Sequence, residues 1–255
     1  MTDLVTVTRD GPVATVSFDR GGSRNAFNQA LILELTRVAR AFHDDPETRA
    51  VVLTGRPDAF SAGIDLKERA TRDDEAESDI ALRDVYYRGV KLCQAWEDMP
   101  QVTVAAIEGM AVGAGIALPL ALDWRVMARD AFLYVPEVRI GINLQWGALP
   151  RLITLVGPAR AKRICILCER MGPEMALDWG LVDELAAPGE AVRVAQRLAG
   201  EAAAMPPVAT RMVKEAVNAI SGALHKVGAY ADADQSALSS ATRDARAASQ
   251  AFTQR

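Results

Sequence analysis

The sequence predicts an α/β fold, because short apolar runs alternate with segments that have helical spacing. The runs, which are rich in β-branched residues, predict strands at residues 13–18, 50–55, 102–109, 124–128 and 131–138. Helical patterns lie between several of them, at residues 28–44, 80–98, 115–122 and 158–167. Strands that alternate with helices in this way indicate an α/β core.

Length and composition limit the organisation of the chain. Its 255 residues are long for one ordinary domain and short for two. Half of the residues are hydrophobic and 24% are charged, as in soluble globular proteins, which excludes a disordered or fibrous chain. From Ala191 onward the sequence is rich in Ala and charged residues, with a break at Pro206 and Pro207 and a last helical stretch at 232–252. The C-terminal quarter is therefore expected to be helical.

The charge balance argues against a nucleic-acid partner. Lys and Arg number 29 against 33 Asp and Glu, and the net charge of −4 offers no overall attraction to a phosphate backbone. The start of the chain has no basic region followed by an apolar run, and no uncharged apolar segment reaches membrane-spanning length. We expect a cytoplasmic protein that binds neither nucleic acid nor a membrane.

Cysteine and histidine are sparse. An odd set of three cysteines implies no disulfide framework and favours a reducing compartment. Cys165 and Cys168 form a C-x-x-C pattern inside an apolar helical segment, so we interpret them as buried structural thiols. His43 and His225 lack the spacing of a zinc site, which predicts a mechanism without a metal.

Two glycine-containing segments could present backbone amides to a ligand. In residues 59–68 (AFSAGIDLKE), Gly63 lies among small residues directly after a strand and turn. Residues 108–118 (EGMAVGAGIAL) follow the predicted VTVAAI strand with a small-residue turn and a helix start, which leaves N–H groups free. A dinucleotide site is not expected there, because Leu118 occupies the place of the third glycine.

Glu137 is a lone carboxylate at the end of an apolar predicted strand. Desolvation in such a setting disfavours the charged form and suits a general acid or base. A partly exposed Glu on a strand is the alternative. Residues 70–78 are the most polar stretch, and we interpret them as a mobile surface loop or as a loop that covers a ligand.

Together, seven ordered segments resemble the enoyl-CoA hydratase/isomerase family, the crotonase superfamily. These are RNAFN (24–28), AFSAGIDLKE (59–68), EGMAVGAGIAL (108–118), ALDWRVMA (121–128), VPEVRIGI (135–142), PRLITLVGPARAKRI (150–164) and ALDWGLVDEL (176–185). The resemblance implies a spiral of repeated ββα units with an acyl-CoA site at residues 1–195. It also implies a helical oligomerisation region at 196–255, which packs homotrimers or a dimer of trimers.

The chemistry implied by the resemblance is the formation of an enolate at the carbonyl of an acyl-CoA thioester. Carried over to this sequence, the two oxyanion-hole amides fall on Ile64, after Gly63, and on Ala114, after Gly113. Two fixed N–H groups stabilise the developing charge without reorganising, and each is typically worth ~3 kcal/mol. Coenzyme A enters as part of the substrate, and no separate cofactor is expected.

The sequence departs from the family's hydratases at one catalytic position. Those enzymes carry two glutamates, and the first falls here on Ala117 while the second is present as Glu137. One carboxylate suffices to move a proton from the α- to the γ-carbon, so the leading hypothesis is a Δ3,Δ2-enoyl-CoA isomerase. The alternatives are a hydratase that uses a water held by Gln145, a β-keto acyl-CoA hydrolase or carbon–carbon-cleaving enzyme, and a CoA-binding homologue without activity.

Further substrate contacts follow from the same resemblance. Arg24 and Lys67 match basic positions near CoA, with an ordinary surface cation as the alternative for each. Gln145 and Trp146 replace a small, glycine-rich stretch, either as a repacked loop or as a wall of the acyl pocket. Residues adjoining these motifs complete the predicted substrate-binding set, namely Ala26, Ala62, Gly63, Asp65, Gly113 and Ala117.

Overall fold

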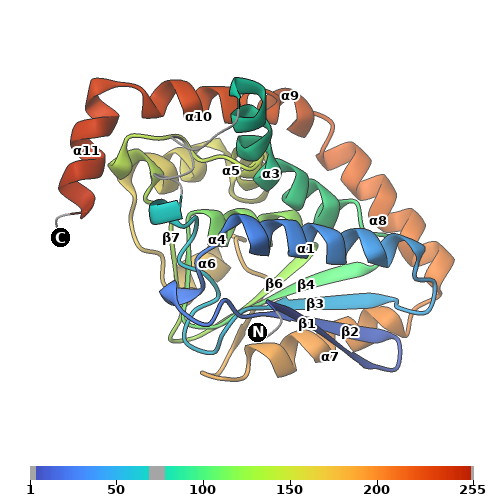
Figure 1. Cartoon of the computed structure of the whole chain (residues 1–255). Helices are drawn as coiled ribbons and strands as arrows, with labels where there is room; N and C mark the ends of the chain where they lie inside the picture. Colours follow the sequence, from blue (N-terminus) through green and yellow to red (C-terminus); the bar gives the residue numbers. More distant parts are fainter. Residues whose placement is uncertain (1–3, 69–77, 254–255) are drawn as a thin grey trace.

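The computed structural model describes residues 4–68 and 78–253 and has the expected α/β architecture (Figure 1). Its main sheet has six strands in the order β1-β2-β3-β4-β6-β8, and only the β1–β2 pair is antiparallel. The strands are β1 (Val5–Asp10), β2 (Val13–Phe18), β3 (Ala50–Thr54), β4 (Val102–Ile107), β6 (Trp124–Ala128) and β8 (Glu184–Ala186). A second, parallel pair joins β5 (Met110–Val112) to β7 (Phe132–Tyr134).

Helices cover both faces of the main sheet. Figure 1 shows α1 (Gln29–Ala41) above the sheet and α7 (Ala191–Ala203) below it. Helix α1 begins after Asn28, whose side chain accepts a hydrogen bond from the backbone N of Leu31 at 2.9 Å. Helix α3 (Asp79–Glu97) packs on α1 and is capped in the same way by Ser78. The strands between these helices are buried, which explains their continuous apolar runs.

Helix α7 contacts the sheet through a row of alanines. Ala191, Ala195, Ala199 and Ala203 recur every four residues and are all buried. This spacing places them on one helix face, which lies against β2, β3, β4 and β6. The helix crosses residue 195, where we expected the core to end, and stays on the sheet to Ala203.

The segments that build the site lie between β5 and α7. After β5 come α4 (Ala114–Ala117) and η3 (Pro119–Ala121), and after β7 come η4 (Glu137–Ile140), α5 (Ala148–Leu167) and α6 (Pro173–Asp178). Helix α5 is interrupted at Gly157, whose φ is 77°. The predicted helix at 158–167 is therefore its second half, which starts at Pro158 because proline favours the first helical position.

The C-terminal helices run along the outer edge of the molecule (Figure 1). They are α8 (Pro207–Ser221), α9 (His225–Ala229), α10 (Asp232–Ser240) and α11 (Arg243–Thr253). The single helix predicted at 232–252 is thus two helices. The break falls where the Thr242 hydroxyl accepts a hydrogen bond from the Ala245 backbone N at 3.2 Å, as an N-cap does.

Three other predictions need correction or lie outside the described residues. The strand predicted at 131–138 ends at Tyr134, and Glu137 begins η4 because the chain turns at Pro136 (φ −88°, ψ 3°). Strands β1, β5 and β8 were not predicted; β5 and β8 have three residues each, too short for a periodic signal. Of the polar segment, residues 70–77 lie outside the described residues. No helix within the described ranges is long and apolar enough to span a membrane.

Candidate active site

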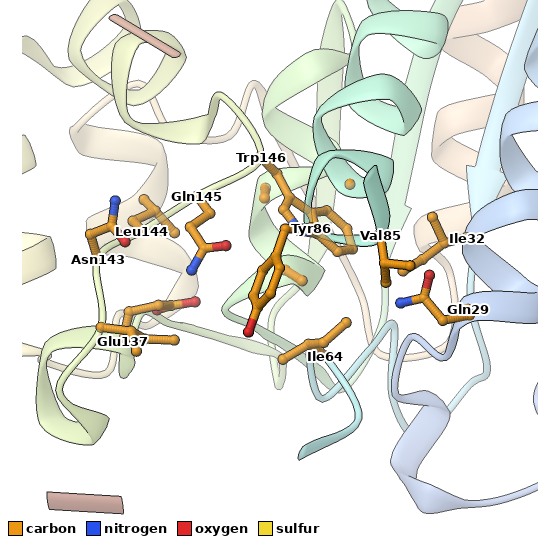
Figure 2. Close-up of a pocket in the computed structure, with 14 residues that line it drawn as sticks. Gln29, Ile32, Ile64, Val85, Tyr86, Glu137, Asn143, Leu144, Gln145 and Trp146 are labelled. Carbon is orange, nitrogen blue, oxygen red and sulfur yellow. The ribbon is translucent and has the colours of Figure 1, made fainter. Parts of the chain in front are cut away.

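A small cavity of about 60 Å³ lies between α1, α3, α4, η4 and the loop that precedes α5 (Figure 2). It brings together six residues expected at the site from the sequence: Ile64, Ala114, Ala117, Glu137, Gln145 and Trp146. The rest of its lining comprises Gln29, Ile32, Val85, Tyr86, Gly89, Ile142, Asn143 and Leu144. Glu137 is the one carboxylate among the described residues that line it.

The backbone around Ile64 is held so that its N–H group remains unpaired. Phe27 N donates to Gly63 O at 2.7 Å, and Asp65 N donates to Phe27 O at 2.9 Å. Because successive residues of an extended segment face opposite sides, the N–H group of Ile64, which lies between Gly63 and Asp65, points away from Phe27. No acceptor for the Ile64 N–H exists within residues 4–68 and 78–253.

Gly63 permits the close approach of this segment to β5. Its φ is +90°, and a Cβ added there would come within 2.7 Å of the Val112 carbonyl oxygen. That same position lies 3.5 Å from the backbone N of Ala114. The segment that carries Ile64 and the turn that carries Ala114 are therefore in direct contact.

Ala114 provides a second unpaired N–H group. It is the first residue of α4, and the first N–H groups of a helix have no partner inside the helix. Gly113, with φ at 53°, turns the chain there, while its own N donates to Tyr134 O at 2.9 Å. The described part of the chain offers no acceptor for Ala114 N. Ile64 and Ala114 thus present two backbone donors to one cavity.

Glu137 is buried beside these donors. The residue is 9% exposed, and Oε2 has no hydrogen-bond partner in the described part of the chain. Burial removes water from the carboxylate and raises the pKa of Glu137 to about 7, against a smaller lowering by a backbone hydrogen bond. At neutral pH such a carboxyl group can both accept and return a proton.

Ala117 lies one helical turn after Ala114 and is 1% exposed. It lines the cavity with a methyl group only, so the position where the family's hydratases carry a first glutamate has no polar function here. Nearby, the Cys93 thiol contacts the Ala117 carbonyl oxygen at 3.6 Å, and burial raises the pKa of Cys93 to about 12.

The loop before α5 contributes Gln145 and Trp146 to the cavity. Gln145 Nε2 donates to the hydroxyl of Ser236 on α10, and Trp146 is almost fully buried. Of the aromatic residues on α3, Tyr86 lines the cavity, while Trp96 belongs to the core. The Tyr87 hydroxyl donates to Tyr230 O at 2.6 Å and therefore connects α3 to the C-terminal helices.

The remaining residues predicted to bind substrate lie around the Ile64 segment, outside the cavity lining. Arg24 and Lys67 are exposed, and Arg24 O accepts a hydrogen bond from Ala62 N at 3.0 Å. Asp65 forms an ion pair with Arg20, whose Nη1 also donates to Ala26 O at 3.2 Å. Through its ion pair with Arg20, Asp65 fixes the Ile64 segment to the neighbouring backbone at Ala26.

Sequence reasoning missed the residue that ties this segment together. Asn25 is fully buried, and its Nδ2 donates to the carbonyl oxygens of Phe18 and Phe60 at 3.1 and 3.0 Å. Its Oδ1 accepts a hydrogen bond from Arg20 N at 3.0 Å, and its φ is 58°. The tolerance of asparagine for left-handed backbone was the available signal.

A buried carboxyl group beside two unpaired backbone N–H groups is an arrangement that can transfer a proton next to an oxygen that gains negative charge. The profile of the enoyl-CoA hydratase/isomerase family matches residues 8–255 of this chain. The chain belongs to that family and is an acyl-CoA enzyme.

Individual relatives agree with this assignment. "Probable enoyl-CoA hydratase echA6" of Mycobacterium bovis is 34% identical over 215 residues, which cover 84% of this chain and 82% of the relative. The short-chain-enoyl-CoA hydratase of Clostridium acetobutylicum is 30% identical over 215 residues, 84% of this chain and 80% of the relative. The crystal structure of an enoyl-CoA hydratase from Bacillus anthracis superposes with a TM-score of 0.79 at 30% identity, and covers 99% of this chain and 96% of that one. The crotonase fold is thereby confirmed.

Proposed function

We propose that this enzyme is a Δ3,Δ2-enoyl-CoA isomerase in which Glu137 is the single acid and base. The observation that carries the proposal is that the described cavity lining contains a single carboxylate, Glu137. Ala117 contributes only a methyl group at the position where a hydratase of this family would need a second carboxylate. Addition of water generally requires one group for the water and another for the α-proton, whereas a shift of a double bond requires one base.

The thioester carbonyl oxygen accepts hydrogen bonds from the N–H groups of Ile64 and Ala114. Negative charge develops on this oxygen when the α-proton leaves, and two donors that are already in place stabilise it without reorganising. Loss of one such donor typically lowers kcat by about 10²–10³-fold.

Glu137 then shuttles a proton between two carbons. The carboxylate takes the proton from C2 of a 3-enoyl thioester, and the C–H electron pair enters the conjugated dienolate. The same carboxyl group returns the proton to C4, which re-forms the carbonyl and leaves the double bond between C2 and C3. Its pKa of about 7 supports both transfers near neutral pH. The cycle uses no cofactor beyond the CoA of the substrate.

The exposed cations beside the Ile64 segment suit the CoA portion. We assign Arg24 and Lys67 to its phosphates, since guanidinium and ammonium groups both bind phosphate. The backbone at Ala26, Ala62, Gly63 and Asp65 shapes this side, and Gly113 shapes the turn before Ala114. Gln145 and Trp146 contact the acyl group. A cytoplasmic location remains a prediction.

Oligomerisation through the C-terminal helices is a further part of the proposal. Large apolar side chains are exposed on α8 and just after it, as expected of a face that is covered in an assembly. They are Val208, Met212, Val213, Val217, Ile220 and Leu224. We infer a homotrimer or a dimer of trimers, to be tested by analytical ultracentrifugation, in which a monomer at micromolar concentration would oppose the inference.

Hydration is the second candidate function, and the names of the relatives favour it. Both curated relatives above carry the name hydratase. In that case Glu137 acts with a water molecule that the Gln145 amide helps to hold, because both residues line the same cavity.

The experiment that separates the two candidates is incubation of the purified protein with a 3-enoyl-CoA and, separately, a 2-enoyl-CoA in deuterated water. Chromatographic separation of the two isomeric thioesters, followed by mass spectrometry, should show conversion of the 3-enoyl to the 2-enoyl thioester without gain of water. A 3-hydroxyacyl product would support hydration instead. Inactivity on both would shift the assignment to β-keto acyl-CoA cleavage or to CoA binding alone. Glu137→Gln is the control, and it should lose turnover with both substrates.

A further inference from the structure

The indole of Trp146 closes one side of the cavity. Its residue is 7% exposed, and the ring packs edge-on against Phe27, with centroids 5.5 Å apart and an interplanar angle of 63°. Figure 2 shows Glu137 on one side of the cavity and the side chains of Val85, Ile32 and Trp146 on the other. An acyl chain bound at the Ile64 and Ala114 donors therefore lies between Glu137 and this apolar wall.

A gap in α3 accommodates the indole. Gly89 is buried in the middle of this helix, and a Cβ added there would come within 2.0 Å of both Cε2 and Nε1 of Trp146. Glycine inside a helix costs about 0.5–1 kcal/mol relative to alanine. Contact between the indole and the helix backbone explains why glycine stands at this position, and it leaves the ring no space to move toward α3.

The backbone that carries the indole is held from two directions. Trp146 and Gly147 have φ values of 64° and 66°, and the carbonyl oxygens of both accept hydrogen bonds from Arg151 Nη1 at 3.1 and 3.0 Å. Arg151 is buried and forms an ion pair with Glu97 at 2.7 Å. On the other side, Gly147 N donates to Asp232 Oδ2 of α10 at 2.7 Å. A left-handed tryptophan is a strained conformation that persists only where its surroundings enforce it.

The space left beside this wall is small. The cavity measures about 60 Å³, well below the roughly 150 Å³ of an apolar cavity that binds benzene, a ring of six carbons. At the same volume per carbon, 60 Å³ holds about two to three carbons beyond the thioester carbonyl, which fits a short chain such as butyryl. A longer chain that continues toward Trp146 would have to displace the indole from Gly89 and Phe27.

We propose that Trp146 is the specificity-determining residue of this enzyme and limits its substrates to short-chain acyl-CoA thioesters. The proposal rests on the proposed binding mode, in which the thioester carbonyl lies at Ile64 and Ala114. It is independent of whether the enzyme isomerises or hydrates the bound double bond.

The test measures binding of saturated thioesters, which do not undergo either reaction. Calorimetry with the full chain should show that decanoyl-CoA binds at least about tenfold more weakly than butyryl-CoA. An unrestricted apolar pocket would give the opposite order, since each buried methylene adds about fourfold in affinity. Wild-type protein that binds decanoyl-CoA as tightly as butyryl-CoA would overturn the proposal.

Substitution of the wall should change this ratio. In Trp146→Ala, decanoyl-CoA should bind at least about tenfold more tightly than it does to wild type, while affinity for butyryl-CoA stays within about threefold. Trp146→Phe keeps a smaller ring and should shift the ratio in the same direction by at least about threefold, and it serves if the alanine variant does not fold. An unchanged ratio in a folded variant would contradict the assignment.

Trp179→Ala is the matched control. Trp179 stacks with Arg160 and Arg163, at 5.4 and 5.7 Å from the ring centroid, and does not line the cavity. Its removal should leave the ratio of butyryl-CoA to decanoyl-CoA affinity unchanged. A similar shift in this control would assign the effect to general loosening of the protein and overturn the specific role of Trp146.

Discussion

The carboxylate of Glu137 lies directly against Gly113, because a Cβ added at Gly113 would come within 2.5 Å of Oε1. Gly113 also turns the chain so that the next residue, Ala114, begins α4 with an unpaired N–H group. One small residue therefore sets the positions of both Glu137 and the Ala114 N–H group, the proposed base and oxyanion donor.

Substitution at this residue should impair both functions at once. Gly113→Ala introduces a side chain at φ 53° and displaces the carboxylate, so we expect kcat to fall by at least about 10²-fold. Steady-state kinetics with a 3-enoyl-CoA check this expectation. Gly172→Ala is the control, since an added Cβ there meets no atom within 4 Å and the enzyme should keep its activity. Full activity of Gly113→Ala would contradict the proposed geometry.

The pH dependence of catalysis should report the ionisation of Glu137. Its pKa is raised to about 7 by burial, and only the ionised form takes the α-proton. We expect kcat/KM to rise about tenfold per pH unit below that pKa and to level off above it. A pH–rate profile measures this directly, and a break near the ordinary value of 4.5 would show that burial does not control this carboxyl.

The same raised pKa has a consequence for stability. The native state keeps a proton that the unfolded chain releases, so the stabilisation is complete below 4.5 and is lost as the pH rises through about 7. Glu137→Gln cannot ionise and should be more stable than wild type at about pH 8, by up to ~3 kcal/mol, with no advantage at about pH 4. Denaturant unfolding at both pH values measures the difference. Glu215→Gln, at an exposed site on α8, should behave like wild type.

Restoring the missing carboxylate should alter the products. Ala117 lines the cavity with Glu137, so Ala117→Glu supplies a second acid or base at the position where the family's hydratases carry one. We expect the ratio of 3-hydroxyacyl to 2-enoyl product to rise by at least about tenfold, because acid–base groups are typically worth 10²–10⁴-fold. Product analysis by mass spectrometry checks the ratio. An unchanged ratio in a folded variant would mean that other groups decide between the two reactions.

The sequence allowed prediction of the features that depend on local patterns. The apolar runs at 13–18 and 124–128 coincide with β2 and β6. The small-residue turns indicated two segments with free amides, and the resemblance to the family indicated Ile64 and Ala114 within them. The prediction that Glu137 lies on a strand was wrong, because the chain turns at Pro136 and the extended backbone ends before Glu137. From the sequence, a buried and a partly exposed Glu137 were both open, and the structure shows the buried one.

Other parts of the site depend on contacts between distant segments. Gln145 meets Ser236 and Gly147 meets Asp232 across 91 and 85 residues, and the Gly89 gap fits an indole that lies 57 positions later in the chain. No periodicity or spacing in the sequence encodes such pairs. They arise when α10 and α3 pack on the loop before α5, which only the folded chain shows.

The most direct test of the account is the fate of deuterium during turnover of a 3-enoyl-CoA in deuterated water. A single carboxyl group that carries the proton from C2 to C4 should yield a 2-enoyl-CoA that has gained no water, with deuterium at C4 only to the extent that the carboxyl proton exchanges with solvent before it is returned. Glu137→Gln should abolish this product while it still binds butyryl-CoA. Formation of a 3-hydroxyacyl-CoA as the main product, or undiminished isomerisation by Glu137→Gln, would contradict the account.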